Sequence, residues 1–227
     1  MALTGKPVGI LGMYRSGTSS VAKALQALGV QFGDEKDHFP SNEFNPGGYF
    51  ELTKLTEINR LLLRSFDRAY NRISPLPAEW RSYPRSDKLL IALHQLLERS
   101  LGGQGLWGWK EPITSLIVPV YDEVLRRDAL NAHYVVCVRH PIDVANSQRK
   151  MLSFLGDLSF GMWLFYTLSA LYWTRGASRS VVPYERLLDD PRQALEPCAS
   201  SRGIAASEEE LEDQRLHLAV GQSGLPE

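Results

Sequence analysis

Four short apolar runs, separated by longer stretches of helical period, limit most strongly how this chain can fold. The runs cover residues 8–11, 106–109, 133–138 and 180–183. Short apolar runs of this kind are typical of strands that are buried on both faces of a sheet. Apolar residues recur with a helical period over residues 18–28, 52–66, 87–101, 141–152 and 158–175. Strands that alternate with helices indicate an α/β fold of three layers, with a central parallel sheet flanked by helices.

The length of 227 residues suits a single domain over residues 1–227. Ser207 and Glu210 have the spacing of a capping box, so residues 206–227 are expected to form a polar C-terminal helix or tail. The stretch 158–173 is too short for a membrane span, which needs roughly 18 to 20 apolar residues, and 158–175 is expected to be a helix buried on most sides. Because residues 1–6 lack the apolar region of a signal peptide, a cytoplasmic enzyme is expected.

Charge and cysteine content exclude several classes of partner. The formal net charge is −1, which argues against a surface built to hold nucleic acid. The two cysteines are too few for a disulfide framework or a cysteine metal cluster. An anion site in this chain must therefore come from the local placement of a few cations.

Such a local placement is visible where the predicted strands end. Arg15 lies in the segment after the first strand, Lys110 follows the second and Arg139 follows the third. Parallel sheets bind ligands beyond the carboxyl ends of their strands. The sequence therefore predicts a focused anion site at this edge of the sheet.

The segment 12–20, Gly-Met-Tyr-Arg-Ser-Gly-Thr-Ser-Ser, joins the first strand to the first helix. Two glycines allow a tight turn, and backbone N–H groups at the helix N-terminus favour a bound phosphate or sulfate. A charge-assisted hydrogen bond from the arginine strengthens such a site. The residues expected to hold the anion are Arg15, Ser16, Gly17, Thr18, Ser19 and Ser20.

This loop resembles a Walker A loop without being one. Gly12 and Gly17 have the Walker A spacing, and a P-loop-like topology is expected. Thr18, however, stands where the Walker A lysine belongs, and no Asp at a later strand end offers a magnesium partner. A P-loop nucleotide kinase or NTPase is therefore disfavoured and stays an alternative, as does a strand–helix turn that merely carries glycines.

Two motifs together resemble the family of sulfotransferases that use 3′-phosphoadenosine 5′-phosphosulfate (PAPS). Segment 12–20 is similar to the 5′-phosphosulfate loop of that family, in which Lys or Arg precedes Ser-Gly-Thr. Segment 138–147, Val-Arg-His-Pro-Ile-Asp-Val-Ala-Asn-Ser, resembles the 3′-phosphate motif, because Ser147 follows Arg139 by eight positions. Segment 183–191 looks like the later Tyr-Glu-Asp-Leu segment, and 45–51 and 107–112 are similar to segments of bacterial members. The matches occur in order over most of the chain.

The chain departs from the family pattern at two places. Arg186 follows Glu185 where the family usually has Asp. The glycine-rich C-terminal nucleotide segment of the cytosolic eukaryotic members is also missing, as it is from several bacterial and carbohydrate sulfotransferases. The missing segment is therefore interpreted as a subfamily difference, and the resemblance is to a bacterial-type member.

The resemblance implies a role for each matched position in the nucleotide site. Arg15 and the backbone of residues 17–20 would hold the 5′-phosphosulfate, and Arg139 with Ser147 would bind the 3′-phosphate. Tyr184 would contact the adenine, and Lys110 would neutralise the sulfuryl oxygens. From the residues alone, each of these positions has an alternative. Ser147 in isolation reads as a solvated helix serine, Tyr184 as a core tyrosine, and Lys110 as a surface lysine that pairs with Glu111.

The acceptor hydroxyl needs a base, which in this family is a His or a Glu. Glu51, which precedes a helix, is the first candidate and Glu43 the second. Alternatively, Glu51 is a negative charge at the start of a helix that interacts favourably with the positive end of the helix dipole. The remaining candidates are Glu35, His38, Glu111 and His140. The irregular segment 31–50 is expected to be a loop on the substrate side.

The resemblance implies sulfuryl transfer from PAPS, as co-substrate and without a metal, to an acceptor hydroxyl of a carbohydrate or small molecule. The second alternative is a module that binds a nucleotide bisphosphate without catalysis. Aromatic residues of the stretch 163–173 are expected to pack in the core rather than line an acceptor pocket. The sequence names neither the acceptor nor an oligomeric state.

Overall fold

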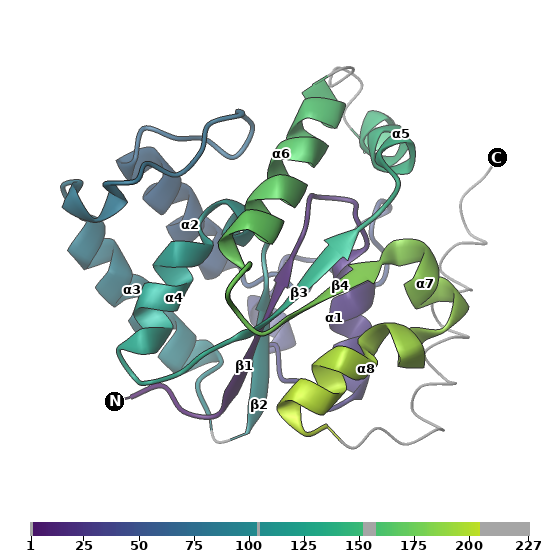
Figure 1. Cartoon of the computed structure of the whole chain (residues 1–227), viewed down its shortest axis with the longest axis horizontal. Coiled ribbons are helices and arrows are strands. Elements are labelled where there is room, and N and C mark those ends of the chain that lie inside the picture. Colours follow the sequence, from purple (N-terminus) through teal and green to yellow (C-terminus); the bar gives the residue numbers. More distant parts are fainter. Residues whose placement is uncertain (1, 104, 152–157, 205–227) are drawn as a thin grey trace.

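The computed structural model describes residues 2–103, 105–151 and 158–204, and it has a four-stranded parallel sheet flanked by helices (Figure 1). The strands are β1 (Lys6–Leu11), β2 (Leu106–Lys110), β3 (His133–Val138) and β4 (Arg179–Pro183). All four strands expected from the sequence are present, each with bounds within two residues of the expected ones. The prediction of an α/β fold is confirmed.

The order of the strands places the carboxyl end of β1 at the middle of the sheet. The order is β2-β1-β3-β4, and all three neighbouring pairs are parallel. The chain moves from β1 to β2 on one side and then to β3 on the other side of β1. Such a switch opens a crevice between the carboxyl ends of β1 and β3, which is where open α/β sheets bind ligands.

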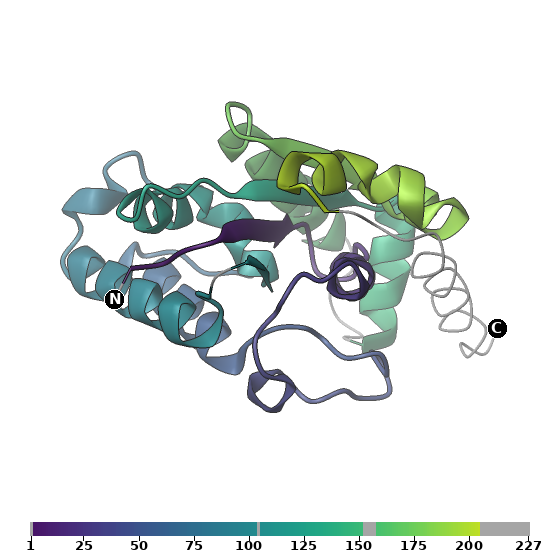
Figure 2. The ribbon, with the colours of Figure 1, turned by 90° about the horizontal axis from the view of Figure 1, so that it is seen from below.

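Helices cover both faces of the sheet (Figure 2). One face carries α2 (Thr53–Ser65), α3 (Ser86–Ser100), α4 (Val118–Arg126) and α6 (Leu158–Trp173). The other face carries α1 (Thr18–Ala27), α7 (Tyr184–Asp189) and α8 (Pro191–Arg202). Helix α5 (Pro141–Met151) follows β3. The short 3-10 helices are η1 (Glu35–Asp37), η2 (Trp80–Ser82) and η3 (Pro112–Leu116). Alternation along β3 separates the two cores, since Tyr134 and Val136 face the first and Val135 and Cys137 face the second.

Helix α6 is not buried on most sides, so that prediction is wrong. Its inner face includes Tyr166 and Ala170, which are fully buried. Its outer face carries Phe160, Leu164, Leu168 and Tyr172, which are 40 to 54% exposed. These four residues recur every fourth position and therefore share one face of the helix. Tyr172, which was expected in the core, lies on this exposed face. Within the described part of the chain, no helix is long and apolar enough to cross a membrane.

Three helices were not predicted from the sequence, namely α4, α7 and α8. A start signal for α8 is nevertheless present, because Pro191 stands in the first turn and the Asp190 carboxylate accepts a hydrogen bond from the Gln193 N–H at 3.0 Å. The expected polar helix or tail over residues 206–227 lies outside the described residues.

Candidate functional site

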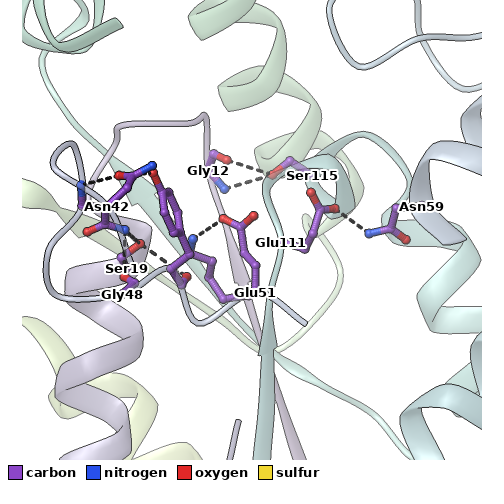
Figure 3. A network of polar contacts seen from close by, with 11 residues as sticks. Gly12, Ser19, Asn42, Gly48, Glu51, Asn59, Glu111 and Ser115 are labelled. Carbon is purple, nitrogen blue, oxygen red and sulfur yellow. Dashed lines mark hydrogen bonds and ion pairs between the residues drawn. The ribbon is translucent and has the colours of Figure 1, made fainter. Parts of the chain in front are cut away.

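The segment between β1 and α1 is a strained loop held from behind. Gly12, Arg15 and Gly17 all have positive φ, at 145°, 72° and 88°. The Gly12 N–H donates to Ser115 Oγ at 2.9 Å, which joins the loop to η3 (Figure 3). No side chain of the described residues caps the first turn of α1. Its N–H groups therefore remain available for an anion.

Two arginines and a serine meet beside this loop. Arg15 Nε donates to Ser147 Oγ at 2.8 Å, and Arg139 Nη1 donates to the Arg15 carbonyl at 3.3 Å. Burial, with a smaller contribution from Arg139, lowers the pKa of Arg15. Neither arginine forms an ion pair with a carboxylate among the residues that the structure describes. An anion placed here would offset two close, partly buried positive charges.

Two buried polar atoms in the same region have no hydrogen-bond partner within the described part of the chain. They are Arg139 Nε and Ser16 Oγ. A buried polar atom without a partner costs about 1–3 kcal/mol, so it points to a missing ligand or water. The residues present therefore fit a bound phosphate or sulfate group at this edge of the sheet.

Tyr184, at the start of α7, packs on the end of the loop. The Arg139 guanidinium lies 4.5 Å from the centroid of its ring. A Cβ atom built on Gly17 would come within 2.2 Å of Tyr184 Cδ2. Only glycine at position 17 lets the tyrosine ring approach this closely.

Replacing Gly17 by alanine should destabilise the protein more than replacing Gly29 by alanine. Both glycines have φ of +88°, so the two substitutions share the cost of a left-handed conformation, roughly 1–2 kcal/mol. A Cβ on Gly29 meets no atom within 4 Å, whereas one on Gly17 meets Tyr184. Urea unfolding measures both losses, and equal losses would contradict close packing of Tyr184 on the loop.

Lys110 and Glu51 form a buried ion pair on the other side of β1. Lys110 ends β2 with its side chain 2% exposed, and its Nζ pairs with Glu51 Oε1. The ring of Tyr49 lies 5.9 Å from the same Nζ. The alternative of a surface lysine paired with Glu111 is therefore wrong. Glu111 continues the extended backbone with φ of −156° and ψ of 116°, and consecutive side chains of extended backbone point to opposite faces.

Glu111 belongs to a second, fully buried network. Asn59 Nδ2 donates to Glu111 Oε2 at 2.5 Å (Figure 3). The Tyr121 hydroxyl in turn donates to Asn59 Oδ1 at 2.9 Å. Burial, and next the charge of Glu51, raise the pKa of Glu111 to about 8. Sequence reasoning missed this network. Its signal was Asn59, a polar residue on the apolar face of α2 between Leu55 and Leu62.

The loop before α2 contacts the phosphate loop. Asn45 Nδ2 donates to Ser19 Oγ at 3.3 Å and to the Gly48 carbonyl at 2.7 Å. Ser19 Oγ lies 3.5 Å from the Tyr49 carbonyl. These contacts bring the segment expected on the substrate side next to both the anion site and the Lys110–Glu51 pair.

The other candidate bases lie elsewhere. Glu43 and Glu35 are exposed, and His38 Nε2 contacts the Phe32 carbonyl at 2.8 Å. His140 is exposed, and its backbone N–H donates to Glu185 Oε1 at 3.3 Å. Of the expected catalytic residues, the structure brings together Glu51 and Lys110, and no described contact joins Glu43 to them.

Comparison with known proteins gives a likeness of fold only. No family model matches the sequence, and no curated protein matches it. The structure is similar to the sulfotransferase STF9 from Mycobacterium avium, with a TM-score of 0.52 and 15% identity over 96% of this chain and 69% of that one. It is similar to the sulfotransferase STF1 from Mycobacterium tuberculosis, with a TM-score of 0.52 and 13% identity over 95% and 72%. A sugar kinase from Janibacter sp. follows with a TM-score of 0.43 and 16% identity over 89% and 96%.

Proposed function

We propose that this chain is a sulfotransferase that moves a sulfuryl group from PAPS to an acceptor hydroxyl. The observation that carries the proposal is the separation of two cationic groups along one sheet edge. Arg15 and Arg139 gather with Ser147 and lack a carboxylate partner among the described residues, whereas Lys110 lies with a carboxylate at the end of β2. PAPS has two anionic groups, and its reacting sulfuryl group needs both a cation and a nearby base.

The donor would lie across the carboxyl ends of β1 and β3. Arg139 and Ser147 would hold the 3′-phosphate, and the Tyr184 ring would lie against the adenine. The 5′-phosphate would rest on Arg15, the backbone of the loop and its hydroxyls. The orphaned Arg139 Nε and Ser16 Oγ supply donors for these oxygens. The hydroxyl-bearing residues of the loop are Ser16, Thr18, Ser19 and Ser20.

Transfer then uses the Lys110–Glu51 pair. Sulfuryl oxygens would compete with Glu51 for the Lys110 ammonium, which leaves the carboxylate free to accept the acceptor's hydroxyl proton. The acceptor oxygen forms a bond to sulfur while the bond from sulfur to the bridging oxygen breaks. Lys110 stabilises the negative charge that develops on the leaving oxygen. The products are a sulfate ester and adenosine 3′,5′-bisphosphate.

A kinase that uses magnesium-ATP fits these residues less well. Thr18 occupies the position of the Walker A lysine. ATP has no 3′-phosphate, so it would leave Arg139 without an anionic partner. A module that binds the bisphosphate without turnover would retain the arginine site and use Lys110 and Glu51 only as a structural pair.

Calorimetric titration tests the donor site. We expect adenosine 3′,5′-bisphosphate to bind more tightly than magnesium-ATP. Arg139→Ala should weaken the binding free energy of the bisphosphate by roughly 1.5–3 kcal/mol, the contribution of a hydrogen bond to a charged group. Arg175→Ala is the matched control, because Arg175 is exposed and also lies over a tyrosine ring, that of Tyr172 at 4.0 Å. Preferred binding of magnesium-ATP, or equal affinity of both variants, would favour the kinase alternative.

A further inference from the structure

Glu111 is a fully buried carboxyl that the proposed transfer does not use. Its side chain is 0% exposed. One of its oxygens, Oε2, accepts from Asn59, whereas Oε1 is buried and has no partner among the described residues. A buried carboxyl oxygen without a partner costs more free energy when it is ionised than when it carries a proton, because an unpaired charge is harder to bury than a neutral group.

The groups that face Glu111 offer it no cation of its own. They come from the loop after β1, the segment before α2, the end of β2, and helices α4 and α6. The titratable ones are Tyr14, Glu51, Lys110, Tyr121 and Tyr166. Lys110 is the single cation in this set, and it already pairs with Glu51. An ionised Glu111 would therefore be a buried charge with no cation of its own, because it would have to share Lys110 with Glu51.

The hydrogen bonds define which oxygen of Glu111 carries the proton. The Tyr121 hydroxyl donates to Asn59 Oδ1, so the amide nitrogen of Asn59 is turned toward Glu111 and donates to Oε2. The proton then belongs on Oε1, the oxygen without another partner. Burial and the charge of Glu51 raise the pKa of Glu111 to about 8, which agrees with this assignment.

We propose that Glu111 is a positioning residue, which stays neutral so that Lys110 is held by Glu51 alone at the end of β2. This inference rests on the proposed function for its catalytic meaning. If Glu111 ionised, its charge would act on Lys110 in addition to that of Glu51, and it would draw the ammonium away from the sulfuryl oxygens. Neutral Glu111 thus keeps the ammonium available to the donor and leaves one carboxylate for the acceptor proton.

Glu111→Gln reproduces the neutral form and removes its titration. The folded wild type retains a proton that its unfolded chain releases above the ordinary carboxyl pKa of 4.5. Wild-type stability should therefore fall relative to the variant as pH rises from about 4.5 to about 8, and the difference should then stay constant. Urea unfolding between pH 4 and 9 measures it, with Glu57→Gln at an exposed position of α2 as the control.

The positioning role is tested by the pH dependence of the Lys110 NMR resonance and by the pH dependence of kcat. In the wild type the NMR resonance of the Lys110 side chain, assigned with Lys110→Arg, should shift with a midpoint near pH 8. In Glu111→Gln that shift should be absent, while kcat at neutral pH stays within about threefold of wild type and its dependence on pH changes near the same midpoint. Asn59→Leu, which removes the hydrogen bond that lowers the pKa of Glu111, should move the stability step and the midpoint to higher pH.

The outcomes separate this inference from the proposed function. A Lys110 resonance with the same pH dependence in wild type and Glu111→Gln overturns the positioning role, even if sulfuryl transfer is found. A wild type without transfer, but with the step in stability and the Lys110 shift, overturns the proposed function and keeps the neutral state of Glu111. If Glu111→Gln does not fold, Asn59→Leu decides, because an unmoved midpoint contradicts the proposal.

Discussion

Replacing Glu51 by glutamine should lower the kcat of sulfuryl transfer by about 10²- to 10⁴-fold, the usual contribution of a general base. Glutamine retains the size of the side chain and a group that can face Lys110, but it cannot take the acceptor proton. Because Glu51 does not contact the arginine site, the affinity for adenosine 3′,5′-bisphosphate should change by less than about threefold. Initial rates at saturating PAPS, together with calorimetry, measure both quantities.

Glu43→Gln is the informative companion to this variant. Glu43 is exposed on the loop before α2, in contrast to the buried Glu51. We expect its kcat to stay close to wild type. A large loss in Glu43→Gln with little loss in Glu51→Gln would transfer the role of base to the loop. Little loss in either variant would contradict general-base catalysis by both residues.

Replacing Lys110 by methionine should reduce the free energy of unfolding by about 3–5 kcal/mol, as expected when one partner of a buried ion pair is removed. Methionine fills most of the space of the lysine stem, so the loss reports mainly on Glu51, which stays buried without its cation. The same variant should have no measurable transfer, because the charge on the leaving oxygen is no longer stabilised. Urea unfolding and a turnover assay measure the two losses.

A double variant tests whether the charge is the cause. Adding Glu51→Gln to Lys110→Met removes the uncompensated carboxylate, so the double variant should be more stable than Lys110→Met alone. Additive losses would show that Lys110 and Glu51 are not coupled in solution. Turnover should stay absent in the double variant, which separates the structural role of the pair from its catalytic role.

The strands, and the cationic residues that follow them along the chain, could be predicted from the sequence. Buried parallel strands leave a clear signal, because both faces must be apolar over a few residues. The ends of those strands then locate Arg15, Lys110 and Arg139 at one edge without any knowledge of packing. Arg15 contacts Ser147, so residues from the two motifs lie side by side, and the nucleotide roles that the motifs imply for them stay predictions.

The pairing of side chains was not accessible in the same way. Glu51 meets Lys110 from 59 positions away, and that contact depends on how the loop before α2 returns to the sheet. Glu111 reads as an ordinary charged neighbour of Lys110, and only the alternation of extended backbone turns it toward Asn59. The burial of helix α6 was wrongly predicted for a related reason. Apolar residues occur on all sides of this helix, so the sequence has no polar face that would mark its exposed side.

The hydrogen bonds between Gly12 and Ser115 have an evolutionary consequence. They connect the loop between β1 and α1 to η3, which begins two residues after Lys110. A shift in the backbone of this loop would therefore also move η3. Under the proposed function, donor binding and sulfuryl transfer would therefore be inherited together. The segment 31–50 meets this unit at Ser19 and at Lys110, through Asn45 and Tyr49, whereas exposed residues such as Glu35 and Glu43 are free to diversify. New acceptors would then arise by changes at such exposed positions, while the proposed donor site and the Lys110–Glu51 pair stay the same.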